Sequence, residues 1–230
     1  TRLTGAPHRW GSVYRSGRAW AYTQGIRRND GLHVAEWNRA FLIQCGLQPR
    51  PVRNQFSLPD EALAAARAFY GQHGLDLDRP TLFIQPFTSS PRKNWPLAHY
   101  MALAQHCQQQ RVQVLWGGGP GDRAALAAAE MSGFPVAAGS PLLVTAGLMQ
   151  LASVVVGGDT GVLHLAVALG KRVVLLLRPC SGSDALPFGH SDWVVRSEGA
   201  GGVADIPVPA VANACQTAFR EVGIACHEGT

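Results

Sequence analysis

What this 230-residue chain lacks narrows its possible functions. Its five cysteines are odd in number, scattered and without a CxxC pair, which argues against a disulfide framework and a zinc site and fits a reducing compartment. Uninterrupted apolar segments stay below the ~18 residues that a membrane-spanning helix needs. The glycine-rich segment 117–121 does not fit G-x-G-x-x-G, because Asp122 occupies the last glycine position, and a GK[ST] sequence is missing, which excludes a P-loop.

Lysine is scarce and the charge is uneven. Eighteen of the twenty basic residues are arginine, and the lysines are Lys93 and Lys171. Residues 1–53 carry nine arginines and two acidic residues, a formal charge of +7, whereas the remainder carries eleven basic and thirteen acidic residues, or −2. A basic segment of this kind favours an acidic partner, either nucleic acid, anionic lipid or an acidic sugar, although a solvated basic surface is the alternative. Because no nucleic-acid-binding motif accompanies the arginines, we expect no nucleic-acid partner.

The chain divides into an irregular start and a regular remainder. Residues 1–47 are interpreted as an arginine-rich loop and one helix at about 33–45, followed by a linker at 48–51. This segment has too little apolar content to form a domain, and the chain begins without Met, so we expect it to be the end of a domain in a longer protein. With 47% hydrophobic and 15% charged residues, the composition is that of a globular α/β protein.

Strands and helices are expected to alternate from residue 58 onward. The predicted strands are 81–85, 112–116, 135–138, 154–156, 173–177 and, at an edge, 193–196. The predicted helices are 59–70, 96–110, 122–131, 141–151, a short one ending at Gly170, and 209–222. This alternation predicts a doubly wound, Rossmann-like parallel sheet, which binds ligands at the carboxyl ends of its strands.

The segment Gly157–Gly170 is the most informative one. An apolar run ends in two glycines, and Asp159-Thr160-Gly161 then opens a short apolar helix. Asp159 or Thr160 is expected to cap this helix through its side chain, and Gly161 leaves the first amides open to an anion. His164 shares a helix face with Thr160. An ordinary capped core helix with a satisfied histidine is the structural alternative.

Two further loops follow predicted strands and are expected at the same sheet edge. The loop 86–96 contains Thr88, Ser89 and Lys93, which suit a phosphate, although a polar surface loop is also possible. After segment 117–121, Asp122 could accept from a ribose diol, cap a helix, or do both. Together the three loops predict a pocket for a nucleoside diphosphate.

Two motifs resemble the ADP-heptose:lipopolysaccharide heptosyltransferases of glycosyltransferase family 9. They are Lys93-x-Trp95-Pro96 and Asp159-Thr160-Gly161-x-x-His164-Leu165-Ala166-x-Ala168-Leu169-Gly170. The resemblance covers residues 58–195 well and 1–50 loosely. It implies a GT-B fold of two Rossmann-like domains, with the active site between them and without metal or cofactor. Residues 1–54 would be the remnant of the N-terminal acceptor-side domain with its linker, and 55–230 the donor-binding domain.

The resemblance also implies residue roles. Lys93 would act catalytically by neutralising charge on the leaving ADP. The residues that would bind the donor are Thr88, Ser89 and Lys93 at the pyrophosphate, Asp159, Thr160, Gly161 and His164 on the same wall, Asp122 at the ribose, and Ser140 to Leu142 at the adenine. Fixed donors near the breaking glycosyl–phosphate bond stabilise the charge that develops there.

The chain departs from the family pattern in three places. Arg178-Pro179-Cys180 stands where Gly-Pro-Thr is usual, and Phe87 where a glycine is common. The family's catalytic base is an Asp near the start of the N-terminal domain, and no matching segment exists here. We therefore expect this chain to bind donor better than it turns it over.

The implied function is inverting transfer of heptose from ADP-heptose to the lipopolysaccharide inner core, in the cytoplasm at the inner membrane. The arginine-rich start would meet an acidic core acceptor or anionic lipid. Two alternatives stay open: a GT-B transferase that uses another nucleotide sugar, and a nucleotide-binding module without transferase activity.

Overall fold

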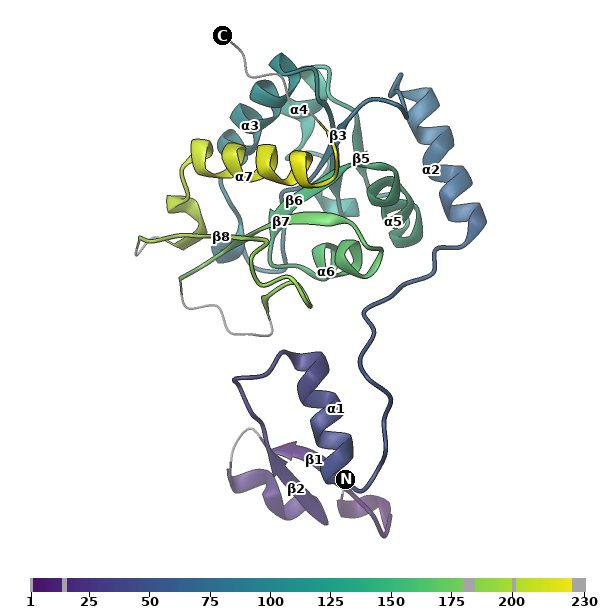
Figure 1. The fold of residues 1–230 in the computed structure, drawn as a ribbon, viewed down its shortest axis with the longest axis vertical. Coiled ribbons are helices and arrows are strands. Elements are labelled where there is room, and N and C mark those ends of the chain that lie inside the picture. Colours follow the sequence, from purple (N-terminus) through teal and green to yellow (C-terminus); the bar gives the residue numbers. More distant parts are fainter. Residues whose placement is uncertain (1, 14–15, 180–184, 200–201, 225–230) are drawn as a thin grey trace. The chain divides into compact units, whose positions relative to one another are not determined.

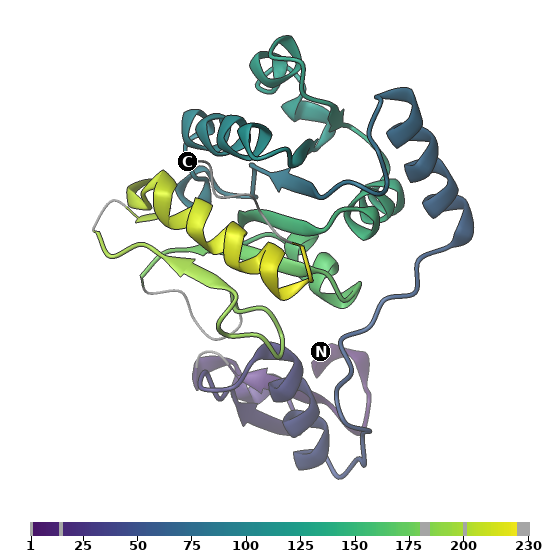
Figure 2. The same cartoon turned by 45° about the horizontal axis from the view of Figure 1, so that its top comes forward.

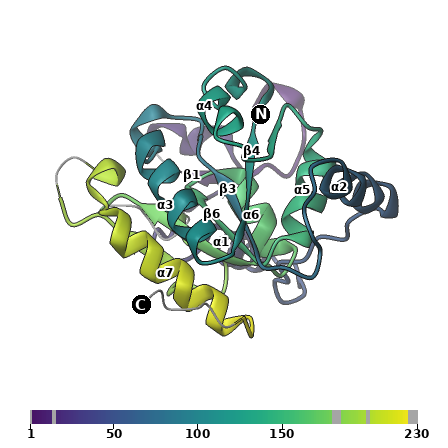
Figure 3. The ribbon, with the colours of Figure 1, turned by 90° about the horizontal axis from the view of Figure 1, so that it is seen from above.

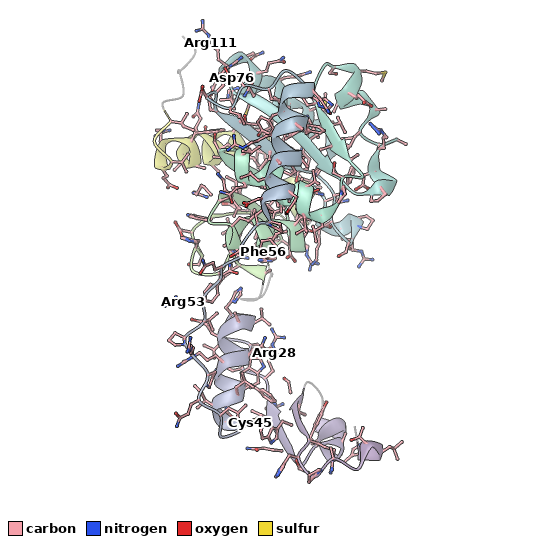
Figure 4. All side chains as sticks on the ribbon, turned by 90° about the vertical axis from the view of Figure 1, so that its right-hand side faces the viewer. Arg28, Cys45, Arg53, Phe56, Asp76 and Arg111 are labelled. Atoms are coloured by element: carbon pink, nitrogen blue, oxygen red, sulfur yellow. The ribbon has the colours of Figure 1, made fainter. Side chains whose placement is uncertain are left out.

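The structure, a computed structural model, describes residues 2–13, 16–179, 185–199 and 202–224. The chain forms two compact units, the first from Thr1–Arg53 with Ser181–Phe188 and the second from Asn54–Cys180 with Gly189–Thr230. Figure 4 labels Arg53, the last residue of the first stretch, and Phe56, near the start of the second. The sequence analysis did not anticipate that residues near 186 belong with the first unit.

The first unit contains a small sheet that the sequence analysis missed. Strands β1 (Trp10–Val13) and β2 (Gln24–Arg27) pair in parallel, joined by a 3₁₀ helix, η2 (Ser16–Ala21); another, η1 (Arg2–Thr4), precedes them. Helix α1 (Val34–Gln44) packs Trp37 against Ile26 and Cys45, in agreement with the predicted helix. The expectation of one loop and one helix was wrong, because four-residue strands carry little periodic signal and parallel pairing is not local.

The second unit is built on a parallel sheet of six strands in the order β5-β4-β3-β6-β7-β8 (Figure 1). The strands are β3 (Thr81–Gln85), β4 (Gln113–Gly118), β5 (Val136–Ala138), β6 (Val154–Gly158), β7 (Arg172–Leu177) and β8 (Val194–Arg196). All six predicted strands are present, and the last is at the edge as expected. Strands β3, β6 and β7 are buried throughout, which explains their nearly continuous apolar sequences.

Helices cover both faces of this sheet. Helices α3 (Leu97–Gln109) and α7 (Val208–Glu221) lie side by side on one face, as Figures 2 and 3 show. On the other face, α5 (Leu142–Leu151) packs against α6 (Gly161–Ala168) and against α2 (Asp60–Gln72). Within the described residues, no helix has the length and apolar character needed to cross a membrane.

Some element boundaries differ from the prediction because of glycine and proline. Strand β4 continues through Gly117 and Gly118, which pair with β5 as Gly117↔Ala137 and Gly118↔Ala138. The predicted helix 122–131 is only a 3₁₀ turn, η4 (Pro120–Asp122), and a short helix, α4 (Ala127–Met131). Pro96 is the N-cap residue of α3, one position before the expected one.

One glycine permits the close packing of α2 on α5, and it yields a stability prediction. A Cβ at Gly147 would lie 2.7 Å from the Ala62 carbonyl oxygen and 2.8 Å from the Ala66 Cβ. Gly147→Ala should therefore lower the free energy of unfolding by about 1–3 kcal/mol, because the helix backbones must separate. Gly71→Ala is the matched control, since a Cβ there meets nothing within 4 Å; it should stabilise by about 0.5–1 kcal/mol. Urea unfolding that ranks the two variants equally would contradict this account of the packing.

Candidate functional site

The strand order creates a switch point between β3 and β6. The chain proceeds from β3 outward through β4 to β5, then returns to β6 and proceeds outward in the other direction through β7 to β8. In sheets of this kind, ligands bind outside the carboxyl ends of the two central strands. The loop 86–96 leaves β3 at this point, and Asp159 and Thr160 follow β6.

A carboxylate joins these two loops. The Asp159 Oδ2 lies 2.6 Å from the Lys93 Nζ, and its Oδ1 lies 3.5 Å from the His164 Nε2. The three side chains are partly buried, with exposed fractions of 31% for Lys93, 20% for Asp159 and 32% for His164. Hydrogen bonding from His164 and the charge of Lys93 outweigh the effect of burial and hold the pKa of Asp159 at about 2. The carboxylate is therefore ionised at neutral pH and keeps Lys93 at the switch point.

The backbone of β6 approaches the first loop closely. A Cβ at Gly158 would lie 2.7 Å from the Lys93 carbonyl oxygen and 2.8 Å from the Thr88 Cγ2. A glycine is needed here, because any side chain would push the loop that carries Lys93 away from β6.

The 86–96 loop is held from inside by residues that the sequence analysis did not assign to this task. The Asn94 Oδ1 accepts from both the backbone N–H and the hydroxyl of Thr88, each at 2.9 Å. Trp95 is buried and donates from its indole Nε1 to the Ile206 carbonyl at 2.8 Å. The signal for Trp95 was its place in Lys93-x-Trp95-Pro96, whereas Asn94 had no recognisable pattern.

The hydroxyls of this loop differ in availability. Besides its contact with Asn94, the Thr88 Oγ1 lies 2.9 Å from the Ser90 carbonyl oxygen and accepts from the Ser90 N–H at 3.2 Å. Thr88 therefore shapes the loop in this structure. Ser89, the next residue, is exposed.

Helix α6 begins at the same edge, but its cap differs from the prediction. Thr160 is the N-cap residue with an extended backbone, and its side chain makes no cap hydrogen bond. The expected side-chain cap was wrong, because the Asp159 carboxylate is turned to Lys93 and His164 instead. The first amides of a helix have no acceptor within it, and a Cβ at Gly161 would meet nothing within 4 Å. This helix start is open to an anion.

The remaining predicted residues lie at the ends of β4 and β5. The Asp122 Oδ2 accepts from the Gly119 N–H at 2.7 Å, so this carboxylate closes the glycine turn. The Gly139 N–H donates to the Gly118 carbonyl at 3.0 Å and ties the two strand ends together. Ser140 and the 58% exposed Leu142 follow at once. The structure thus brings Lys93, Asp159 and His164 into contact, and places Asp122, Ser140 and Leu142 along the same edge on neighbouring strands.

Across the ranges that the structure describes, no group of three or more His, Cys, Asp or Glu side chains is arranged to hold a metal ion. Lys93 supplies a cationic group at the switch point.

Comparison with known proteins identifies relatives for most of the chain. The family model described as glycosyltransferase family 9 (heptosyltransferase) matches residues 1–202. Lipopolysaccharide heptosyltransferase 2 of Escherichia coli (strain K12) is 30% identical over 134 residues, which are 54% of this chain and 38% of that protein. The protein of the same name from Salmonella typhimurium is 30% identical over 131 residues, again 38% of its length. The matched segment therefore spans well under half the length of these two curated relatives.

Solved structures share the fold. The glycosyl transferase family 9 protein from Veillonella parvula has a TM-score of 0.82 at 20% identity, covering 95% of this chain and 69% of that one. The ADP-heptose lps heptosyltransferase II of E. coli has a TM-score of 0.72 at 22% identity, and the match covers 95% of this chain and 72% of that one. E. coli heptosyltransferase WaaC with ADP has a TM-score of 0.65 at 20% identity, and the match covers 92% of this chain and 64% of that one. The predicted fold class, α/β of the GT-B type, is confirmed over the part of these structures that the chain covers.

The Asp159 contacts generate a pH prediction. A carboxyl whose folded pKa is depressed stabilises the fold above its unfolded pKa of about 4 and loses this contribution as the pH falls through the folded value. Relative to Asp159→Asn, the native chain should therefore lose stability between about pH 4 and pH 2. A carbon-detected NMR titration should place the Asp159 midpoint at about 2. Both His164→Gln and Lys93→Met should raise that midpoint, and a native midpoint near 4 would contradict the geometry.

Proposed function

Because the chain belongs to glycosyltransferase family 9, we propose that it is the donor-binding part of an inverting heptosyltransferase. Its donor would be ADP-heptose and its acceptor the inner core of lipopolysaccharide. The observation that carries the proposal is the contact of Lys93 with Asp159 and of Asp159 with His164 at the switch point between β3 and β6.

The chemistry of the reaction requires positive charge at this point. Breaking the bond between the sugar and the diphosphate leaves negative charge on the departing ADP. Lys93 and the open amides at the start of α6, near Gly161, would stabilise that charge. The Ser89 hydroxyl would donate to the same phosphates, and Thr88 would keep the loop in shape for them. Asp159, with His164, would hold Lys93 in place and form the wall beside Thr160.

The rest of the donor would extend along the sheet edge. The second carboxylate oxygen of Asp122 would accept from the ribose hydroxyls, while its Oδ2 holds the glycine turn. Ser140 and Leu142 would border the adenine, with the exposed Leu142 side chain offering an apolar surface. These roles follow the order of the strands, because the loops after β6, β3, β4 and β5 succeed one another along one edge.

The first unit would belong to the acceptor side. Its arginines suit an acidic sugar or lipid phosphate, and a peripheral contact with the anionic cytoplasmic face of the inner membrane fits the same charge.

A donor with a different sugar is the second candidate, and one observation favours it. Arg178 follows β7 where the family usually has glycine, is exposed, and accepts at its carbonyl oxygen from the Arg196 Nη1 at 3.3 Å. Two arginines therefore stand at the carboxyl ends of β7 and β8, beside the site. A nucleotide-binding module without transferase activity is the third candidate, because no residue of this chain has been assigned the role of catalytic base.

Calorimetry with ADP, UDP and GDP distinguishes the candidate nucleotide-sugar donors. We expect ADP to bind more tightly than UDP or GDP, because the adenine edge is formed by Ser140 and Leu142. Tight binding of UDP alone would refute the heptose assignment.

In the full-length protein, a catalytic Asp in the first βα loop would support transfer, and its absence would support the binding module.

The role of Lys93 in ADP binding can be tested by substituting it and, as a control, its neighbour Arg92. Lys93→Ala should weaken ADP binding about tenfold or more while changing adenosine binding little, because a charge-assisted contact to phosphate is lost. Arg92→Ala is the matched control: this cation lies in the same short helix, η3 (Pro91–Lys93), but is exposed, and its removal should leave ADP binding within about twofold. Equal losses for ADP and adenosine in Lys93→Ala would mean that Lys93 does not contact the pyrophosphate.

A further inference from the structure

The side chain of Asn94 closes the loop 86–96 on itself. Asn94 follows η3 with an extended backbone (φ −84°, ψ 133°), so the chain leaves the 3₁₀ turn immediately after Lys93. Its Oδ1 reaches back six residues and accepts from the Thr88 N–H at 2.9 Å, with the Thr88 hydroxyl at the same distance. One amide oxygen therefore joins the two ends of the segment that carries Ser89 and Lys93.

Both ends of this segment lie against one residue of β6. A Cβ at Gly158 would be 2.7 Å from the Lys93 carbonyl oxygen and 2.8 Å from the Thr88 Cγ2. Gly158 is thus the common support of the two positions that Asn94 ties together. A loss of the contact between Asn94 and Thr88 would therefore also change where the Lys93 backbone lies on β6.

The residue after Asn94 is anchored in the core. Trp95 is 2% exposed, and its Nε1 donates to the Ile206 carbonyl oxygen at 2.8 Å. Its ring also meets the Tyr100 ring edge-on, with 4.8 Å between the centroids. Asn94 connects this fixed point to Thr88, and Lys93 precedes it directly.

The Lys93 side chain depends on the position of its backbone, because its partner belongs to another loop. The Lys93 Nζ lies 2.6 Å from the Asp159 Oδ2, and the other oxygen of that carboxylate lies 3.5 Å from the His164 Nε2. Lysine carries its charge on a flexible four-carbon stem. Its ammonium therefore stays at one carboxylate only if the backbone that bears it is held within reach.

We propose that Asn94 is a positioning residue of the donor site: it closes the loop on Thr88 and thereby holds Lys93 at Asp159, where a diphosphate would meet it. The nucleotide part of this inference rests on the proposed function. Asn94 acts through Thr88 and Lys93 and not by binding nucleotide itself. Its effect is preorganisation, which reduces the freedom that Lys93 must lose when an anion binds.

The scarcity of lysine allows the position of Lys93 to be followed without a nucleotide, since Lys171 is the only other lysine of the chain. A limiting amount of an N-hydroxysuccinimide ester labels both amines, and peptide mass spectrometry gives the ratio of Lys93 to Lys171. Lys171, whose Nζ donates to the Gln150 carbonyl at 3.1 Å, is the internal reference for global unfolding. Asn94→Ala should raise this ratio by about threefold, because the ammonium loses a partly exposed ion pair.

Three further variants separate positioning from general damage. Asn94→Asp keeps the Oδ1 acceptor, so its ratio should stay at or below the native one. Asn213→Ala removes an exposed asparagine of α7 and should change nothing. Thr88→Val removes only the hydroxyl contact and should raise the ratio less, and it serves if Asn94→Ala fails to fold. An unchanged ratio in the variant that folds, or equal rises in Asn94→Ala and Asn94→Asp, would overturn the proposal.

Calorimetry on the same variants reports the nucleotide part. Asn94→Ala should weaken ADP binding by about threefold to tenfold and change adenosine binding little, because only the diphosphate requires an ordered Lys93. Native ADP binding that Asn94→Ala leaves unchanged, or an equal loss for ADP and adenosine, would refute the proposal and leave the donor assignment intact. A native chain that binds no ADP would refute the donor assignment, whereas the labelling ratio would still decide whether Asn94 positions Lys93.

Discussion

The Asp159 carboxylate is the group on which the candidate site depends. It binds Lys93, 66 positions away in sequence, and lies beside His164 on α6, so it joins the loop after β3 to the start of the next helix. This contact requires two features of the sheet. Strands β3 and β6 must be neighbours, and Gly158 must lack a side chain so that the Lys93 backbone can approach. The site is therefore a consequence of strand order and of one glycine.

Lys93 and Arg39 differ in how far the structure satisfies their charged groups. Lys93 has a carboxylate partner before any ligand is present, which limits its mobility and lowers the energetic cost of leaving it partly buried. An incoming diphosphate must share or replace that partner. The Arg39 Nε is buried and has no hydrogen-bond partner among the described residues, so this group is satisfied less completely than Lys93.

Much of the second unit could be predicted from local patterns, and the exceptions have identifiable physical causes. Apolar runs predicted strands such as β3 and β7 because both faces of the sheet are covered. Gly117 and Gly118 gave no strand signal, yet β4 continues through them because β5 pairs with them. The side-chain cap predicted at Asp159 or Thr160 is absent: Thr160 is the N-cap residue without a cap hydrogen bond, and the Asp159 carboxylate binds a distant lysine instead. Strands β1 and β2 were missed because their pairing joins separate segments of an arginine-rich region.

By itself, the sequence determined the alternation of strands and helices, the family resemblance and the residue types of the candidate site. These depend on apolar periodicity and on short motifs, which are local properties. Only the tertiary structure decided which of these residues meet. It placed Lys93 against Asp159, assigned Thr88 to its own loop, and gathered Arg39, Glu36 and Phe188 around one pocket. Such contacts depend on strand order and on segments far apart in the chain, and neither is specified by the residues on each side of a motif.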